Sequence, residues 1–215
     1  MVKTIIYEPM TTITDLIIAI IAFYYSSELT SIYINQLLNV QYHWIWTFRM
    51  LSLGAFLGAL SHGVGPYCSA SIANIIWKFA TYSIGIMSYC MFLSMLHHLF
   101  EYQLVIRLRW VLLCLLVIYF FTVTRNDDFV NVVLFYLFIM SVVLVGFLYS
   151  YVVFQSDGVS MIMLGIIITF VSAGVQQSRI TLHENMNHND IAHFIQMIAM
   201  RCFYLGSIVL QDGII

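Results

Sequence analysis

Charged residues are scarce in this sequence, and their scarcity excludes an ordinary soluble domain. Asp, Glu, Lys and Arg together make up 8% of the 215 residues, whereas a soluble globular domain carries about 25%. Water is therefore not the main solvent for most of the chain. The formal net charge is −2, so the sequence has no excess of positive charge to attract nucleic acid or an anionic lipid surface. No nucleic-acid partner is expected.

Proline and cysteine are also rare. The chain has two prolines, Pro9 and Pro66, and no long polar tail, so residues 1–215 are interpreted as a single domain. The four cysteines, none in a Cys-x-x-Cys motif, are Cys68, Cys90, Cys114 and Cys202. Three of them fall inside apolar runs, where a free cysteine behaves as a small apolar core residue. The cysteines therefore indicate neither a redox function nor a cellular compartment.

Long apolar runs are abundant. Hydrophobic residues make up 62% of the chain, and about 20 predominantly apolar residues suffice for a helix to cross a bilayer. This rule predicts seven segments, at residues 11–33, 44–64, 69–96, 104–123, 129–154, 159–177 and 190–210. Such continuous runs indicate helices rather than the alternating strands of a barrel. The predicted fold is an all-α bundle of seven transmembrane helices with successive helices as antiparallel neighbours, in a multi-pass integral membrane protein whose membrane the sequence does not identify.

Polar residues are costly inside a membrane helix, so their positions are the best guide to function. In seven antiparallel helices, the starts of the first, third and seventh and the ends of the second and sixth lie on one side. The polar residues on that side are Asp15, His62, Asn74, Lys78, Gln176, Gln177, His188, Asn189, Asp190 and His193. They are far apart in sequence, yet this topology places them at one depth. We therefore expect a functional site there.

In the second segment, Gly54, Gly58 and His62 are spaced so that they share one helix face. Small residues at this spacing let helices approach closely. His62 is therefore predicted to point into the bundle.

The start of the seventh segment has the strongest local pattern. Asn189 followed by Asp190 is typical of a helix start, but capping does not account for His193, a turn inside an otherwise apolar helix. Asn189 and His193 share a face of an ideal helix, whereas His188 lies about 140° from His193. Whether His188 or Asn189 reaches the site depends on where the helix begins.

Three histidines at one depth suit a zinc ion. The candidate ligands are His62, His188 and His193. A catalytic zinc takes three protein ligands and a water whose pKa falls to about 7. Asp190 is the candidate for orienting a ligand or accepting a proton, and Asn74 or Lys78 for polarising a substrate carbonyl. The sequence thus raises the hypothesis of a metal centre.

The helix order and these residues resemble the superfamily, often called CREST, that groups alkaline ceramidases with adiponectin and progestin receptors. In that superfamily, one histidine late in helix two and two near the start of helix seven hold zinc, supported by a serine and an aspartate. His62 in ALSHG and His193 in NDIAH match two of these ligands. Three positions differ: Asn189 stands where the other helix-seven histidine is expected, Gly58 replaces the serine, and Asn74 is the polar residue nearest to the missing aspartate.

The resemblance implies a membrane-embedded, zinc-dependent hydrolase of a lipid amide or ester, similar to a ceramidase, with its substrate in the bilayer. Zinc would activate a water that attacks the lipid carbonyl. Asp190 is the first candidate for moving the proton, and Asp15 is the second.

Two other functions fit the same residues. The polar cluster would serve a non-enzymatic receptor or structural membrane protein as a ligand pocket or hydrogen-bond network. In a haem-binding electron carrier, His62 would pair with His193, or His43 would meet His97 or His98 on the far side. The simplest interpretation of His43, His97 and His98 is that they lie in wet interfacial loops.

Overall fold

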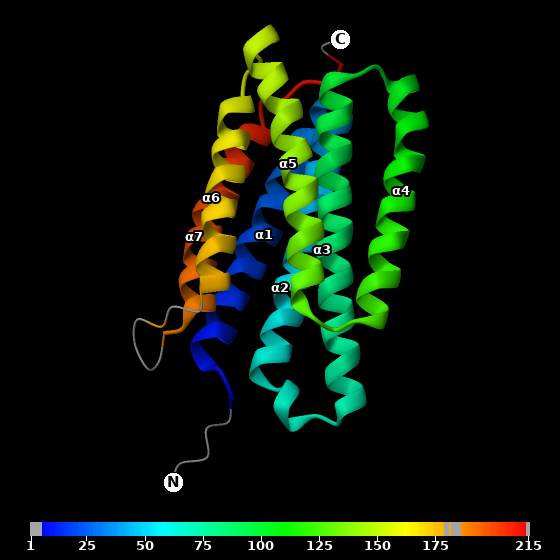
Figure 1. Ribbon diagram of the computed structural model, residues 1–215. Coiled ribbons are helices and arrows are strands. Elements are labelled where there is room, and N and C mark those ends of the chain that lie inside the picture. The colour runs from blue at the N-terminus through cyan, green and yellow to red at the C-terminus, as the bar shows by residue number, and fades with distance from the viewer. Residues whose placement is uncertain (1–5, 179–180, 182–185, 214–215) are drawn as a thin grey trace.

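The computed structural model describes residues 6–178, 181 and 186–213, and its architecture is helical (Figure 1). The helices of the described residues are α1 (Pro9–Gln36), α2 (Asn39–Gly63), the 3-10 helix η1 (Gly65–Tyr67), α3 (Ala70–Leu99), α4 (Tyr102–Arg125), α5 (Phe129–Phe154), α6 (Val159–Ser178) and α7 (His188–Ser207). The all-α prediction is confirmed. The bounds of α5 agree with the predicted ones, and the largest difference is at the start of α2, which begins at Asn39 rather than at residue 44.

Five helices, α1, α3, α4, α5 and α6, are long and apolar enough to cross a membrane. The other two long helices, α2 and α7, carry more polar and charged side chains, among them Arg49 and His62 in α2 and Asp190 and His193 in α7. They are nevertheless 25 and 20 residues long. At a rise of 1.5 Å per residue, about 20 residues match the hydrocarbon thickness of a bilayer.

Six helices form a closed ring, and α4 lies outside it. Around the ring, α1 packs against α2 and α7, α2 against α3, α3 against α5, α5 against α6, and α6 against α7. α4 packs mainly on α3 and touches α5 only slightly, and Figure 1 shows it at the edge of the bundle. Successive helices are thus neighbours, as predicted, except that α3 and α5 close the ring behind α4.

The start of α2 is held by the other end of the chain. The backbone N–H groups of Asn39 and Val40 donate to the Asp212 carboxylate at 2.7 and 2.8 Å, and the Asn39 side-chain amide donates to it at 2.8 Å. A carboxylate at a helix N-terminus satisfies N–H groups that have no partner within the helix. Gly213 donates its backbone N–H to the carbonyl oxygen of His97 in α3. The C-terminal segment therefore joins α2 and α3 at this end of the bundle.

The histidines at the end of α3 are buried. His97 is 7% exposed and His98 1%, so the prediction that they lie in wet loops is wrong. His98 donates from Nδ1 to the carbonyl oxygen of Gln211 at 2.8 Å, and its Nε2 accepts from the Ser150 hydroxyl at 2.8 Å. Because both ring nitrogens are satisfied inside the bundle, His98 connects α3 to α5 and to the C-terminal segment.

Candidate functional site

A cavity of about 340 Å³ lies inside the ring, at the end of the bundle where the polar residues were predicted to meet. Asp15 of α1, His62 of α2, and Asn189 and His193 of α7 all line it. Its remaining polar lining residues are Thr81, Gln176 and Gln196. The predicted convergence of distant residues is therefore confirmed for these side chains.

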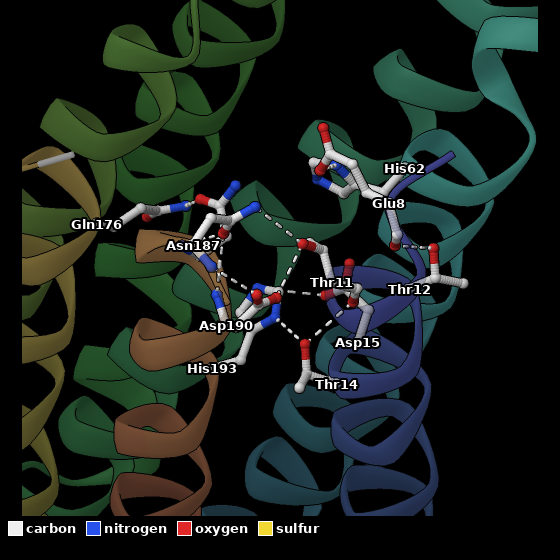
Figure 2. A network of polar contacts seen from close by, with 11 residues as sticks. Glu8, Thr11, Thr12, Thr14, Asp15, His62, Gln176, Asn187, Asp190 and His193 are labelled. Atoms are coloured by element: carbon white, nitrogen blue, oxygen red, sulfur yellow. Dashed lines mark hydrogen bonds and ion pairs between the residues drawn. The ribbon is translucent and has the colours of Figure 1, made fainter. Parts of the chain in front are cut away.

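Asp15 and His193 face each other across the junction of α1 and α7 (Figure 2). The Nε2 atom of His193 lies 3.4 Å from Oδ1 of Asp15, and its Nδ1 atom lies 2.8 Å from the Thr14 hydroxyl oxygen. The Thr14 hydroxyl also lies 3.0 Å from the carbonyl oxygen of Thr11, so it either donates to that carbonyl and accepts Nδ1–H of His193, or donates to Nδ1. In the first arrangement a neutral imidazole and an ionised carboxylate would present two acceptors to each other unless the pair holds one further proton, and in the second Nε2–H faces Asp15. In both arrangements the Asp15–His193 pair shares a proton between Oδ1 and Nε2.

His62 is oriented by a carboxylate from the start of α1 (Figure 2). Its Nδ1 atom lies 2.9 Å from Oε2 of Glu8, and both side chains are partly exposed. A histidine that donates Nδ1–H to a carboxylate carries its free lone pair on Nε2. His62 also lines the cavity, so its imidazole borders the same space as Asp15 and His193.

The first turn of α7 is tied to α1. The Asn187 side chain accepts from the backbone N–H groups of Asn189 and Asp190, and the Asp190 carboxylate accepts from the backbone N–H of Asn187 at 2.8 Å, which together form a capping box. Thr11 of α1 donates its hydroxyl to the other oxygen of Asp190 at 2.8 Å. Asp190 is buried with both oxygens engaged, so its contacts secure the helix start rather than the cavity.

Gly58 makes room for the Asp15 carboxylate. A Cβ atom at position 58 would lie 3.0 Å from Oδ2 of Asp15, which is closer than a normal van der Waals contact. The glycine at the position where the resemblance led us to expect a serine thus lets an acidic side chain from α1 approach α2.

A second, smaller cavity continues from the first between α3, α5 and α6. It measures about 150 Å³, and its lining is mostly apolar. Five residues line both cavities: Leu51, Ile84, Phe129, Gln176 and Gln196. The two spaces together run from an end lined by Asp15 and His193 to a deeper part of the bundle whose lining, among the described residues, has no Asp, Glu, Lys, Arg or His.

A family model covers nearly the whole of this helical chain. The match spans residues 10–212 and is described as a family of unknown function, DUF6962. The chain belongs to this family. No curated protein and no solved structure matches it. DUF6962 membership therefore defines a relationship without a known activity, and the resemblance to CREST stays a prediction.

Besides Asp190, three predicted site residues of this DUF6962 chain lie away from the cavity. His188 is the first residue of α7 and is not among the residues that line it. Asn74 and Lys78 of α3 instead bind Asp127 in the α4–α5 connection, where the Asn74 amide donates at 3.1 Å and the Lys78 ammonium forms an ion pair. The hydrogen bond from Lys78 lowers the pKa of the Asp127 carboxyl below its ordinary value. These α3 residues thus join two parts of the bundle.

The three histidines predicted to hold zinc do not all line the cavity. His62 and His193 do, but His188 does not. Within residues 6–178, 181 and 186–213, no three His, Cys, Asp or Glu side chains are grouped so as to hold a metal ion. The zinc site stays a prediction, and no step proposed below involves a metal.

The geometry of His43 and His97 gives little support to the hypothesis of a haem site. His43 does meet His97, as that alternative expected, with ring centroids 5.0 Å apart and an interplanar angle of 18°. Rings stacked in this way cannot direct their nitrogens at one iron from opposite faces of a porphyrin, as a pair of axial ligands does.

Sequence reasoning missed the side chains that position the cavity residues. Glu8 orients His62, Thr14 orients His193, and Thr11 binds Asp190. A usable signal was present, because Thr11, Thr14 and Asp15 are spaced i, i+3, i+4 and so share one face of α1.

Proposed function

We propose that all seven helices cross a membrane, which makes the chain a multi-pass integral membrane protein. α2 and α7 are long enough to span, and His62 and His193, which lower their apolar character, line an internal cavity rather than the outer surface. Large apolar side chains are exposed on the described helices, among them Ile20, Phe23, Val111, Ile118, Val145 and Val152. Their exposure suits contact with lipid tails.

The ligand of the cavity is proposed to be an amphiphilic lipid. Its polar group would lie against Asp15, His62 and His193, and its chain would enter the apolar cavity between α3, α5 and α6. The observation that carries this proposal is the continuity of the two spaces, which share five lining residues, with ionisable side chains confined to the lining of the larger one and no Asp, Glu, Lys, Arg or His among the described residues that line the deeper one. Small-molecule sites commonly combine an apolar wall with a few convergent polar groups.

Hydrolysis of an amide or ester bond of that lipid is the reaction these groups suit best. His62, held by Glu8, takes a proton from water through Nε2 as the water oxygen attacks the lipid carbonyl carbon. The bond to the leaving amine or alcohol then breaks, and that group receives the proton shared by Asp15 and His193. Transfer of the proton on His62 to that pair, through water, restores the starting state. Proton transfer by such positioned groups contributes about 10²–10⁴-fold to a rate.

Lipid binding without hydrolysis is the second candidate function, as for a receptor. It is favoured by the engagement of Asp190, the first predicted proton carrier, in the capping box and with Thr11. A bound lipid that the purified protein never cleaves would select this alternative.

Lipid turnover by an Asp15→Asn variant tests the hydrolase. With the protein in lipid nanodiscs and labelled lipid amides and esters as substrates, turnover should fall by at least about 10² because asparagine cannot share the proton. Asp157→Asn is the matched control, since Asp157 is an exposed loop residue. Equal turnover by the Asp15 variant and wild type would refute the assigned role.

A further inference from the structure

A separate cavity of about 320 Å³ lies at the opposite end of the bundle, where α4 leaves the ring. α2 and α4 both pack on α3 but not on each other in the described part of the chain. The cavity fills the groove between them and is lined by residues of all three helices. Its polar lining residues are Asn39, Tyr42, His43, Tyr89, His97, Tyr102 and Arg109.

His97 is a buried polar group on this cavity with no bond to the protein. The side chain is 7% exposed and lines the groove. Its ring stacks on that of His43 and lies 6.0 Å from the ring of Tyr102, but neither of its nitrogens is hydrogen-bonded to any described residue. The ring nitrogens of His97 are not among the sealed, unpartnered atoms of the described residues, so they are open to the cavity, where a bound group can reach them. His97 contrasts with its neighbour His98, whose two nitrogens are both satisfied.

The groups around His97 are donors suited to an anion. Arg109 contributes a permanent positive charge and a planar guanidinium, which matches the oxygens of a phosphate better than a lysine would. Tyr89 and Tyr102 can donate phenolic hydrogens, and His43 and His97 can each donate a ring N–H. The net charge of the whole chain is too small to cancel the attraction of these local donors for an anion.

The acidic side chain of Asp212 is bonded to the start of α2 beside this lining. Asp212 borders the groove through Asn39, and its carboxylate accepts three N–H groups from Asn39 and Val40. Carboxylate charge at a helix N-terminus is also offset by the helix dipole. Both Asp212 oxygens are thus engaged at the start of α2, and no carboxylate of the described residues forms an ion pair with Arg109.

We propose that this groove binds a phosphate group, either on a lipid headgroup or as a free ion. Arg109 and His97 are the main contacts, with His43, Tyr89 and Tyr102 as further donors. A cavity of this size accommodates a headgroup. The groove lies at the end of helices long enough to span a bilayer, which is the level of the headgroups. This site is independent of the hydrolase proposed for the opposite end.

Binding of defined phosphate probes tests the assignment and separates its two sources. Delipidated protein in a neutral detergent is titrated with inorganic phosphate, with dihexanoyl phosphatidic acid and with dihexanoylglycerol, which lacks the phosphate. Calorimetry measures the ion, and native mass spectrometry measures the lipids. Arg109→Gln and His97→Gln should each weaken phosphate-dependent binding about tenfold, as expected for loss of a hydrogen bond to a charged group. Arg107→Gln is the control, because Arg107 is exposed on the same helix but does not line the groove.

The phosphate probes distinguish a free-ion site from a lipid-headgroup site. Binding of inorganic phosphate supports a free-ion site, and binding of phosphatidic acid alone supports a headgroup site. The proposal is overturned if neither probe binds, if dihexanoylglycerol binds as well as phosphatidic acid, or if Arg107→Gln weakens binding as much as Arg109→Gln. Since Arg109 is exposed, its substitution keeps the test valid even if the buried His97 variant fails to fold.

Discussion

At the residue scale, the position of the Asp15 carboxylate depends on the absence of a side chain at Gly58. We predict that Gly58→Ser reduces lipid turnover by less than about 10²-fold, the effect of a misplacement of about 1 Å at a reacting group, because the carboxylate has to move by a few tenths of an ångström. The new Cβ would lie 3.0 Å from Oδ2 of Asp15 and would push the carboxylate away from His193. Since Asp15 is a flexible side chain, the melting temperature should fall by no more than about 2–4 °C. Unchanged turnover would show that the close approach has no catalytic role.

Asp127 provides a test of electrostatics outside the proposed membrane-spanning segments. Its pKa is lowered by the hydrogen bond from Lys78, so its stabilising effect is present above the unfolded value of about 3.9 and is lost as the pH falls through the lower folded value. We predict that Asp127→Asn lowers the melting temperature at pH 7 by about 1–2 °C, since an exposed ion pair is weak. The difference from wild type should shrink below pH ~4. A difference that is constant between pH 3 and 7 would contradict this account.

At the element scale, α2 depends on a cap from the far end of the chain. We predict that Asp212→Ala destabilises the protein by about 0.5–2 kcal/mol, the usual effect of removing a helix cap. The N–H groups of Asn39 and Val40 would lose their acceptor. Thermal unfolding in detergent measures the effect, with Asp157→Ala as control. If both variants melt at the same temperature, the C-terminal segment does not stabilise α2.

The contact between Asp212 and the start of α2 also explains why the sequence located the helices but misplaced one helix start. Apolar runs alone located all seven long helices, because length and composition are local properties. The start of α2 was predicted five residues late, at 44 instead of 39. Asn39 and Val40 are helical because Asp212 accepts their N–H groups, and no local pattern reports a contact across more than 170 residues.

At the scale of the whole molecule, antiparallel topology was enough to predict that Asp15, His62 and His193 converge. It could not predict which side chains face one another, because that depends on how α1, α2 and α7 are rotated in the ring. His188 and Asn74 share the right depth but lie off the cavity. The position of α4 outside the ring could not be predicted from the sequence either, because a short connection does not determine which neighbour a helix packs against.

The most direct test compares two histidines at the same end of the bundle. Lipid turnover and bound zinc are measured for His193→Gln and His188→Gln in nanodiscs. We predict that His193→Gln lowers turnover by about 10²-fold or more, whereas His188→Gln, which changes a residue off the cavity, retains it. Loss of zinc and of turnover in both variants would contradict the acid–base account and establish the three-histidine metal site instead.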